Sequence, residues 1–154
     1  MTDRIYYHYC HRESADAILR DGVIRAAAQT LHSDIFALDR GLDTPPLVWL
    51  SPRVDFEPVV TAKHALLITR REDLVAMDGW MCRFHVRTCG DVMDIPTLAA
   101  KYGIDISWFG WLVVTARLIG GDPRSWRVLD RDIPREECVS VEVYDRAKGW
   151  RLFP

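Results

Sequence analysis

The fold is decided by residues 5–25, which read IYYHYCHRESADAILRDGVIR. The first six of these residues are mostly aromatic or β-branched, a composition that predicts a strand over Ile5–Cys10. Side chains alternate along a strand, so its residues divide into two faces, which are Tyr6, His8 and Cys10 on one side and Ile5, Tyr7 and Tyr9 on the other.

The second half of the stretch predicts a helix. Ser14 is a suitable N-cap. The apolar residues after it are spaced three and four apart, as one face of a helix requires, and they are Ala15, Ile18 and Leu19. Gly22 can adopt the left-handed conformation that ends many helices, and Val23-Ile24 then starts a short extended segment.

Further strands are predicted outward from this start. Short extended patterns recur at residues 47–50, 65–69, 80–88, 126–129 and 139–144. A helix starting at Pro58 competes with the strand predicted at 65–69. Residues 26–46 lack a clear period and end in Thr44-Pro45-Pro46, which indicates a helical turn followed by a surface loop.

Two more helices are predicted, at 97–102 and 107–118. The second is apolar on nearly all sides, so we expect it to be buried. The pattern as a whole predicts an α+β fold. No repeat, low-complexity segment or linker interrupts it, so we expect residues 1–154 to form a single domain.

The charge, the apolar runs and the cysteines of the sequence exclude several classes of protein. The formal net charge is -2, with acidic and basic residues mixed along the chain, which argues against a broad nucleic-acid-binding surface. The start of the chain has no apolar signal sequence, and no apolar run is long enough to cross a membrane. Four cysteines without a CxxC pair do not make a disulfide framework. We therefore expect a cytoplasmic protein that does not bind membranes, and the oligomeric state stays open.

Two blocks of short motifs follow one another along the chain. The first contains Tyr7-His8-Tyr9-Cys10, Ile18-Leu19-Arg20-Asp21-Gly22, Val23-Ile24-Arg25 and Val48-Trp49-Leu50-Ser51. The second contains Ser125 to Asp130, Ile133-Pro134 and Val139 to Val143. Their order resembles the ADP-ribosyltransferase superfamily, which includes poly-ADP-ribose polymerase-like enzymes, bacterial ADP-ribosylating toxins and tRNA 2'-phosphotransferases. The resemblance implies a split antiparallel or mixed β-sandwich with about three helices.

The resemblance implies NAD as a substrate and gives roles to residues of the first block. His8 would bond a ribose hydroxyl, the backbone of Tyr9 would hold the nicotinamide carboxamide, and Arg25 would lie near the phosphates or the adenine. These residue types suit those roles, because a neutral imidazole both donates and accepts and a guanidinium matches a phosphate.

The motif strand at 48–51 and the second block supply the remaining candidates for the nucleotide site. Trp49 would take the aromatic position that stacks on nicotinamide, with Ser51 two residues later on the same strand. Trp126 occupies the third motif and is a candidate wall of the site. Packing in an ordinary core is the competing interpretation for both tryptophans.

The chain departs from the superfamily at one catalytic position. Transferases of this kind commonly carry a glutamate at the start of the penultimate strand, where it stabilises the oxocarbenium-like state. Here that position falls at Arg124, Ser125 or Trp126. The family's Ser or Thr two residues after the motif histidine is Cys10.

Three explanations for this departure are open. In the first, a carboxylate at another position in the sequence, Asp130 or Glu142, replaces the missing glutamate. The predicted catalytic residues are then His8, Asp130 and Glu142. Alternatively, the chemistry is of the RNA 2'-phosphotransferase type, in which basic residues converge on phosphate, with Arg12, Arg25, Arg83 and Arg87 as the candidates. Or the chain is a non-catalytic nucleotide-binding or interaction module, such as a phage or bacterial-conflict protein.

The function predicted first is therefore NAD-dependent transfer of ADP-ribose to a macromolecular acceptor, either protein or nucleic acid. Two local patterns bear on the site. Glu142 stands between two valines, so we expect its side chain to face away from them into solvent. The residue types and spacing of Cys82, His85 and Cys89 are similar to those of a metal site. Residues 82 and 85 of one strand face opposite sides, however, and the pattern lacks a fourth ligand, so we expect no metal.

Overall fold

The computed structural model describes residues 4–26, 45–54, 59–61, 66–68, 77–88, 90–105, 110, 113–114, 117, 121–122 and 124–154. The described elements are β1 (Arg4–His11), α1 (Arg12–Asp21), β2 (Val23–Ile24), β3 (Val48–Leu50), β4 (Val59–Thr61), β5 (Leu66–Ile68), β6 (Met81–Thr88), α4 (Ile95–Tyr102), β7 (Arg127–Leu129), β8 (Ile133–Pro134), the 3-10 helix η2 (Arg135–Glu137), β9 (Cys138–Asp145) and β10 (Gly149–Leu152). Helices and strands are both present, as the α+β prediction requires.

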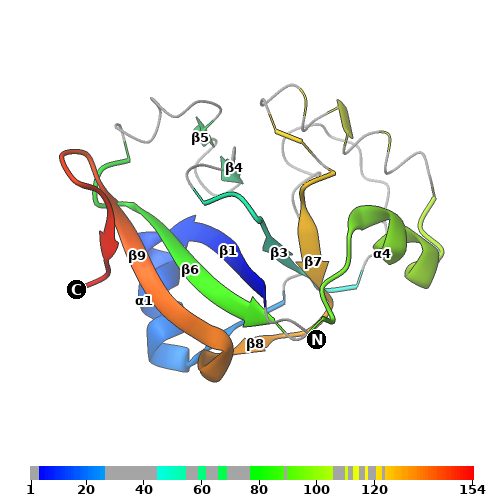
Figure 1. Ribbon diagram of the computed structural model, residues 1–154, viewed down its shortest axis with the longest axis horizontal. Coiled ribbons are helices and arrows are strands. Elements are labelled where there is room, and N and C mark those ends of the chain that lie inside the picture. The colour runs from blue at the N-terminus through cyan, green and yellow to red at the C-terminus, as the bar shows by residue number, and fades with distance from the viewer. Residues whose placement is uncertain are drawn as a thin grey trace.

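The largest element is an antiparallel sheet of four strands in the order β1-β6-β9-β10 (Figure 1). Three two-stranded antiparallel pairs accompany it, namely β2-β8, β3-β7 and β4-β5. One bridge joins β3 to β1, through backbone hydrogen bonds of 2.8 and 2.9 Å between Tyr7 and Ser51. The motif strands β1, β3 and β7 are thereby brought next to one another.

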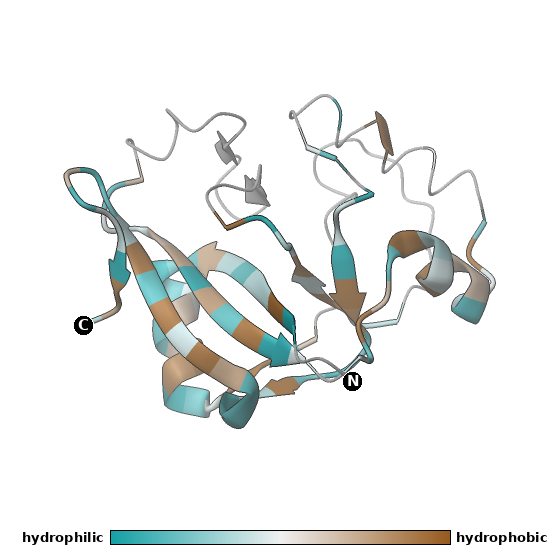
Figure 2. Cartoon of the chain, viewed as in Figure 1, coloured by the Kyte–Doolittle hydropathy of each residue, from teal (hydrophilic) through white to brown (hydrophobic). Residues whose placement is uncertain are grey.

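The main core lies on one face of the four-stranded sheet, beneath α1. The sheet's buried residues on that face include Tyr6, Cys82, Phe84, Val141 and Val143. Hydrophobic and hydrophilic residues alternate along β6 and β9 in Figure 2, as expected when the two faces of a sheet differ in surroundings. The predicted alternation of β1 is confirmed, because Tyr6 enters this core while Tyr7 faces the other side.

Helix α1 begins earlier than predicted. It starts at Arg12, and its N-cap is His11, whose side chain makes no capping hydrogen bond, so Ser14 lies inside the helix and is not its cap. The reason is tertiary, because β1 continues directly into α1 and the Arg12 N–H bonds the Trp80 carbonyl at 2.8 Å. The predicted end is confirmed, since Gly22 has a φ of 72° and its N–H bonds the Ile18 carbonyl.

Most predicted strands are confirmed, with ends shifted by one or two residues. The helix proposed to begin at Pro58 is wrong, because Val59–Thr61 forms strand β4 and pairs with β5. Strands β8 and β10 were not predicted as elements. Both are short. Strand β8 is held by β2, which lies far from it in the sequence, and β10 is held by β9, which directly precedes it in the chain.

Helix α4 corresponds to the helix predicted at 97–102 and starts two residues earlier. Asp94 caps it by accepting a hydrogen bond from the Thr97 N–H at 2.9 Å. Of the helix predicted at 107–118, the four described residues are helical. Val114 is 58% exposed, so the expected burial is wrong at that residue. Residues 27–44 lie outside the described part of the chain. None of the described helices has the length and apolar character needed to cross a bilayer.

Candidate active site

His8 connects β1 to β3 with its side chain. Its Nδ1 lies 3.0 Å from the Trp49 carbonyl oxygen, next to the single backbone bridge between these strands. A carbonyl only accepts, so Nδ1 carries the proton and Nε2 is left as an acceptor. Burial lowers the pKa of His8 below its ordinary value of 6.5, against a smaller upward contribution from the Trp49 carbonyl. The imidazole is therefore neutral at neutral pH.

This linkage predicts a specific pH dependence of stability. The unfolded chain binds a proton at His8 below about pH 6.5, and the folded protein resists it, so stability from this group is present above 6.5 and is lost as the pH falls. Between pH 7.5 and 5.5, we expect the urea midpoint of the wild type to fall more than that of His8→Gln. Parallel midpoints for the two proteins over this range would contradict the assignment.

Trp49 and Trp126 meet where β3 pairs with β7. Their rings make an edge contact with centroids 5.7 Å apart. Both pack against a second core cluster that contains Met93 of the connecting segment and Leu98 of α4. The Trp49 indole N–H is buried, and the described residues offer it no acceptor. Trp49 is therefore partly a core residue, and its indole N–H is a donor without an acceptor among the described residues.

Ser51 and Tyr9 are occupied by local structure. The Ser51 hydroxyl accepts a hydrogen bond from the Arg53 N–H at 3.0 Å, and its backbone pairs with Tyr7. The Tyr9 hydroxyl donates to the Arg53 carbonyl at 2.7 Å. These bonds hold the segment after β3 against β1 and leave the Arg53 side chain exposed.

Glu142 lies in a polar cluster on the sheet face opposite the main core. Nε and Nη2 of Arg83 both lie 2.5 Å from Glu142 Oε2, and His85 Nε2 lies 2.7 Å from the same oxygen. The side chains of Arg83, Glu142 and His85 are 6%, 17% and 21% exposed. Glu142 does face away from the valines, as predicted, but it is not in solvent, because the neighbouring strands enclose it. No described residue donates to Oε1.

The electrostatics of this cluster keep Glu142 ionised. Partial burial by itself would raise the pKa of the carboxyl, but the hydrogen bonds from His85 and Arg83 and the positive charge of Arg83 outweigh it and lower the pKa below 4.5. A half-enclosed carboxylate with one oxygen held and the other without a partner is suited to stabilising positive charge on a ligand.

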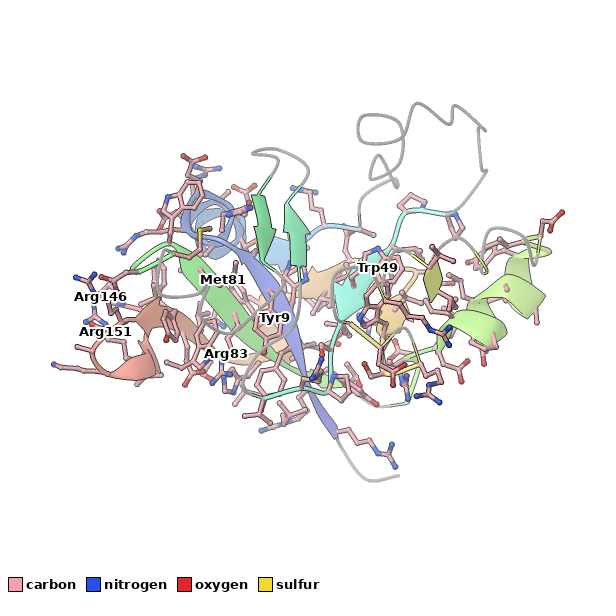
Figure 3. The ribbon with its side chains drawn as sticks, turned by 90° about the horizontal axis from the view of Figure 1, so that it is seen from above. Tyr9, Trp49, Met81, Arg83, Arg146 and Arg151 are labelled. Carbon is pink, nitrogen blue, oxygen red and sulfur yellow. The ribbon has the colours of Figure 1, made fainter. Side chains whose placement is uncertain are left out.

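Two aromatic rings hold Arg83 in place. Its guanidinium lies over the Trp150 ring at 4.3 Å and over the Tyr7 ring at 5.1 Å, and it also donates to the Val54 carbonyl. The Tyr7 ring meets the His85 imidazole edge-on at 4.9 Å. We call Tyr7, Arg83, His85, Glu142 and Trp150 the Glu142 cluster. In Figure 3, Arg83 lies beside Tyr9 over β1 and β6, with Trp49 off to one side.

Asp130 has a different environment at the end of β7. It accepts hydrogen bonds from Lys101 and from the hydroxyl of Tyr102, both at the end of α4. These bonds, with that of Lys101 the larger, lower the pKa of Asp130. The contacts tie α4 to β7, which gives Asp130 a structural role.

The structure does not bring the three predicted catalytic residues together. Phe84 stands opposite His8 on β6, which places His8 on the core face. Arg83 stands opposite Glu142, which places Glu142 on the other face. Asp130 belongs to the end of the β3-β7 pair. The strand partners of His8 and Glu142 on β6 are the adjacent residues Phe84 and Arg83. Because side chains alternate along a strand, His8 and Glu142 nevertheless lie on opposite faces of the sheet.

The four arginines proposed to converge on a phosphate come from three segments of the chain, since Arg12 begins α1, Arg25 follows β2, and Arg83 and Arg87 lie on β6. Arg12 bonds the Gly79 carbonyl at 3.3 Å and lies over the Phe153 ring. Arg83 is committed to Glu142, while Arg25 and Arg87 are exposed on different strands or loops. The phosphotransferase interpretation stays a prediction.

Sequence reasoning missed His85 as the partner of Glu142 and considered it only as a metal ligand. The two-residue spacing of Arg83 and His85 puts both on one face of the strand, and the register then brings Glu142 of β9 to that face. The separation of Cys82 from His85 is confirmed, because Cys82 stands opposite Cys10 in the core. Burial raises the pKa of Cys82 to about 12 and raises that of Cys10, so neither thiol is a ready nucleophile. Cys89 lies outside the described residues.

Comparison with known proteins found no matching family model, no matching curated protein and no matching solved structure.

Proposed function

We propose that this protein binds NAD or a related ADP-ribose-type nucleotide and transfers ADP-ribose from it to a protein or nucleic-acid acceptor. The observation that carries the proposal is the packing of the three family-like motif strands. His8 of β1 bonds the Trp49 carbonyl of β3 at 3.0 Å, and the Trp49 ring contacts that of Trp126, which directly precedes β7. A split β-sandwich of the superfamily's type would use these strands in the same way.

The register of the strands supports a division of the nucleotide between two groups of residues. Trp49 and Glu142 are separated by β1 and β6, a distance of about 14 Å at the usual strand spacing. One nicotinamide riboside cannot contact both. We assign the adenosine end to Trp49 and the nicotinamide riboside to Glu142, while His8, which faces the core, holds Trp49 through its hydrogen bond to the Trp49 carbonyl. In this respect the proposal departs from the resemblance, which would stack nicotinamide on Trp49.

Each end then has suitable chemistry. At the adenosine end, the Trp49 indole supplies a surface on which adenine can stack. Arg53 follows β3, its carbonyl accepts a hydrogen bond from Tyr9 of β1, and its exposed guanidinium suits the diphosphate. At the other end, the Glu142 carboxylate stabilises the positive ribose carbon that forms as nicotinamide leaves. Glu142 thereby replaces the glutamate missing from the motif strand.

Calorimetry with NAD, paired with a nicotinamide-release assay, tests the proposal. Replacing His8 with alanine removes the hydrogen bond that holds the Trp49 backbone in place, so we expect the Kd for NAD to rise about tenfold. His11→Ala, the same substitution at the end of the same strand, should bind NAD like the wild type. Binding without nicotinamide release would indicate a nucleotide-binding module, and no binding at millimolar NAD would refute the proposal.

A further inference from the structure

The hydrogen bond to Glu142 selects one tautomer of the neutral His85 ring. Its Nε2 lies 2.7 Å from Glu142 Oε2, and an ionised carboxylate only accepts, so the proton between them sits on Nε2. Nδ1 of the neutral ring is therefore a lone-pair acceptor. Among the residues that the structure describes, Nδ1 has no hydrogen-bond partner, and the side chain is 21% exposed. The imidazole thus presents a proton-accepting atom at the edge of the Glu142 cluster.

Neighbouring residues fix the orientation of this ring. The Tyr7 ring meets it edge-on at 75°, and Arg83 holds the carboxylate from the other side. Ser140 of β9 stands opposite His85 in the sheet. The charged groups that face the imidazole are therefore Glu142 and Arg83. A carboxylate behind the imidazole stabilises the imidazolium that a proton transfer creates.

We propose that His85 is the proton acceptor for the nucleophile in ADP-ribose transfer, an inference that rests on the proposed function. The bond from the ribose C1' to nicotinamide breaks, and nicotinamide leaves as a neutral molecule with the electron pair. The acceptor's oxygen or nitrogen then forms the new bond to C1'. Its proton passes to His85 Nδ1 and on to water, so NAD and acceptor yield ADP-ribosyl acceptor, nicotinamide and one proton. Glu142 stabilises the first step, and His85 serves the second.

Two reactions of NAD separate these roles. In hydrolysis, water is the nucleophile and must lose a proton. In base exchange, isotopically labelled nicotinamide attacks C1' and regenerates NAD, and no proton is lost. His85→Gln keeps an N–H that can donate to Glu142 but cannot accept a proton. We expect this variant to lose about 100-fold in hydrolysis while base exchange stays within about threefold of the wild type. Imidazole added to the solution should restore part of the hydrolysis.

The control is His11→Gln, which makes the same change at a histidine outside the cluster and should leave both reactions unchanged. Equal losses of hydrolysis and exchange in His85→Gln would show that His85 only holds Glu142, and no loss in either would also overturn the inference. A wild type that catalyses neither reaction would instead refute the proposed function. The ring nitrogen shifts of His85 give a readout without substrate, since a proton found on Nδ1 in the neutral ring would overturn the inference whatever the kinetics.

Discussion

Replacing Arg83 with alanine is expected to lower the free energy of unfolding by about 3–5 kcal/mol. The substitution leaves the Glu142 carboxylate enclosed without the guanidinium that neutralises it. It also removes the group that lies over both Tyr7 and Trp150, and the donor to the Val54 carbonyl. Urea denaturation at neutral pH measures the loss.

Arg87 supplies the matched control for this measurement. It lies on the same strand and the same face as Arg83, but it is exposed, so Arg87→Ala should change stability by no more than about 0.5 kcal/mol. Arg83→Lys should recover only part of the loss, because an ammonium lacks the planar stacking surface and the fork of donors. Similar midpoints for Arg83→Ala and Arg87→Ala would show that the cluster does not stabilise the fold.

Replacing Glu142 with glutamine is expected to slow nicotinamide release from NAD by roughly 100- to 1,000-fold. The amide oxygen still accepts hydrogen bonds from Arg83, but the negative charge that stabilises the ribose cation is gone. Hydrolysis and base exchange should fall together, in contrast to the expected result for His85→Gln. The free energy of unfolding, measured in parallel, shows whether the variant remains folded under the assay conditions.

Asp130→Asn is the decisive comparison, because Asp130 is the other carboxylate that the sequence offers for this role. Its oxygen is engaged by Lys101 and Tyr102, so we expect nicotinamide release within about threefold of the wild type once folding is accounted for. Loss of activity in Asp130→Asn with normal activity in Glu142→Gln would reverse the assignment and move the nicotinamide end to β7.

The two halves of the opening stretch show what local sequence controls. The end of α1 follows from Gly22, because a residue without Cβ adopts the left-handed conformation at little cost wherever the helix lies. The start of α1 does not follow from Ser14. The continuous ladder from β1 to Trp80 carries the chain into the helix before a polar cap is reached, and the partner strand that causes this is almost seventy residues away in the sequence.

The candidate site divides in the same way. Alternation along β6 and β9 was enough to predict that Glu142 faces away from the valines and that Cys82 and His85 face opposite sides, because the period of two belongs to any strand. Alternation could not predict that Glu142 is enclosed. That depends on which strands flank β9, and on the rings that Tyr7 and Trp150 contribute from β1 and β10.

By itself, the sequence determined the elements with strong local signals, the face on which each strand residue lies, and the order of the motifs. The tertiary structure alone decided the register. Register places Tyr9, Arg83 and Glu142 in one row across three strands and places His8 in the next row on the other face. A pattern of side-chain types states only which way each residue faces along its own strand, whereas contact between strands is fixed by backbone pairing and by packing between distant segments.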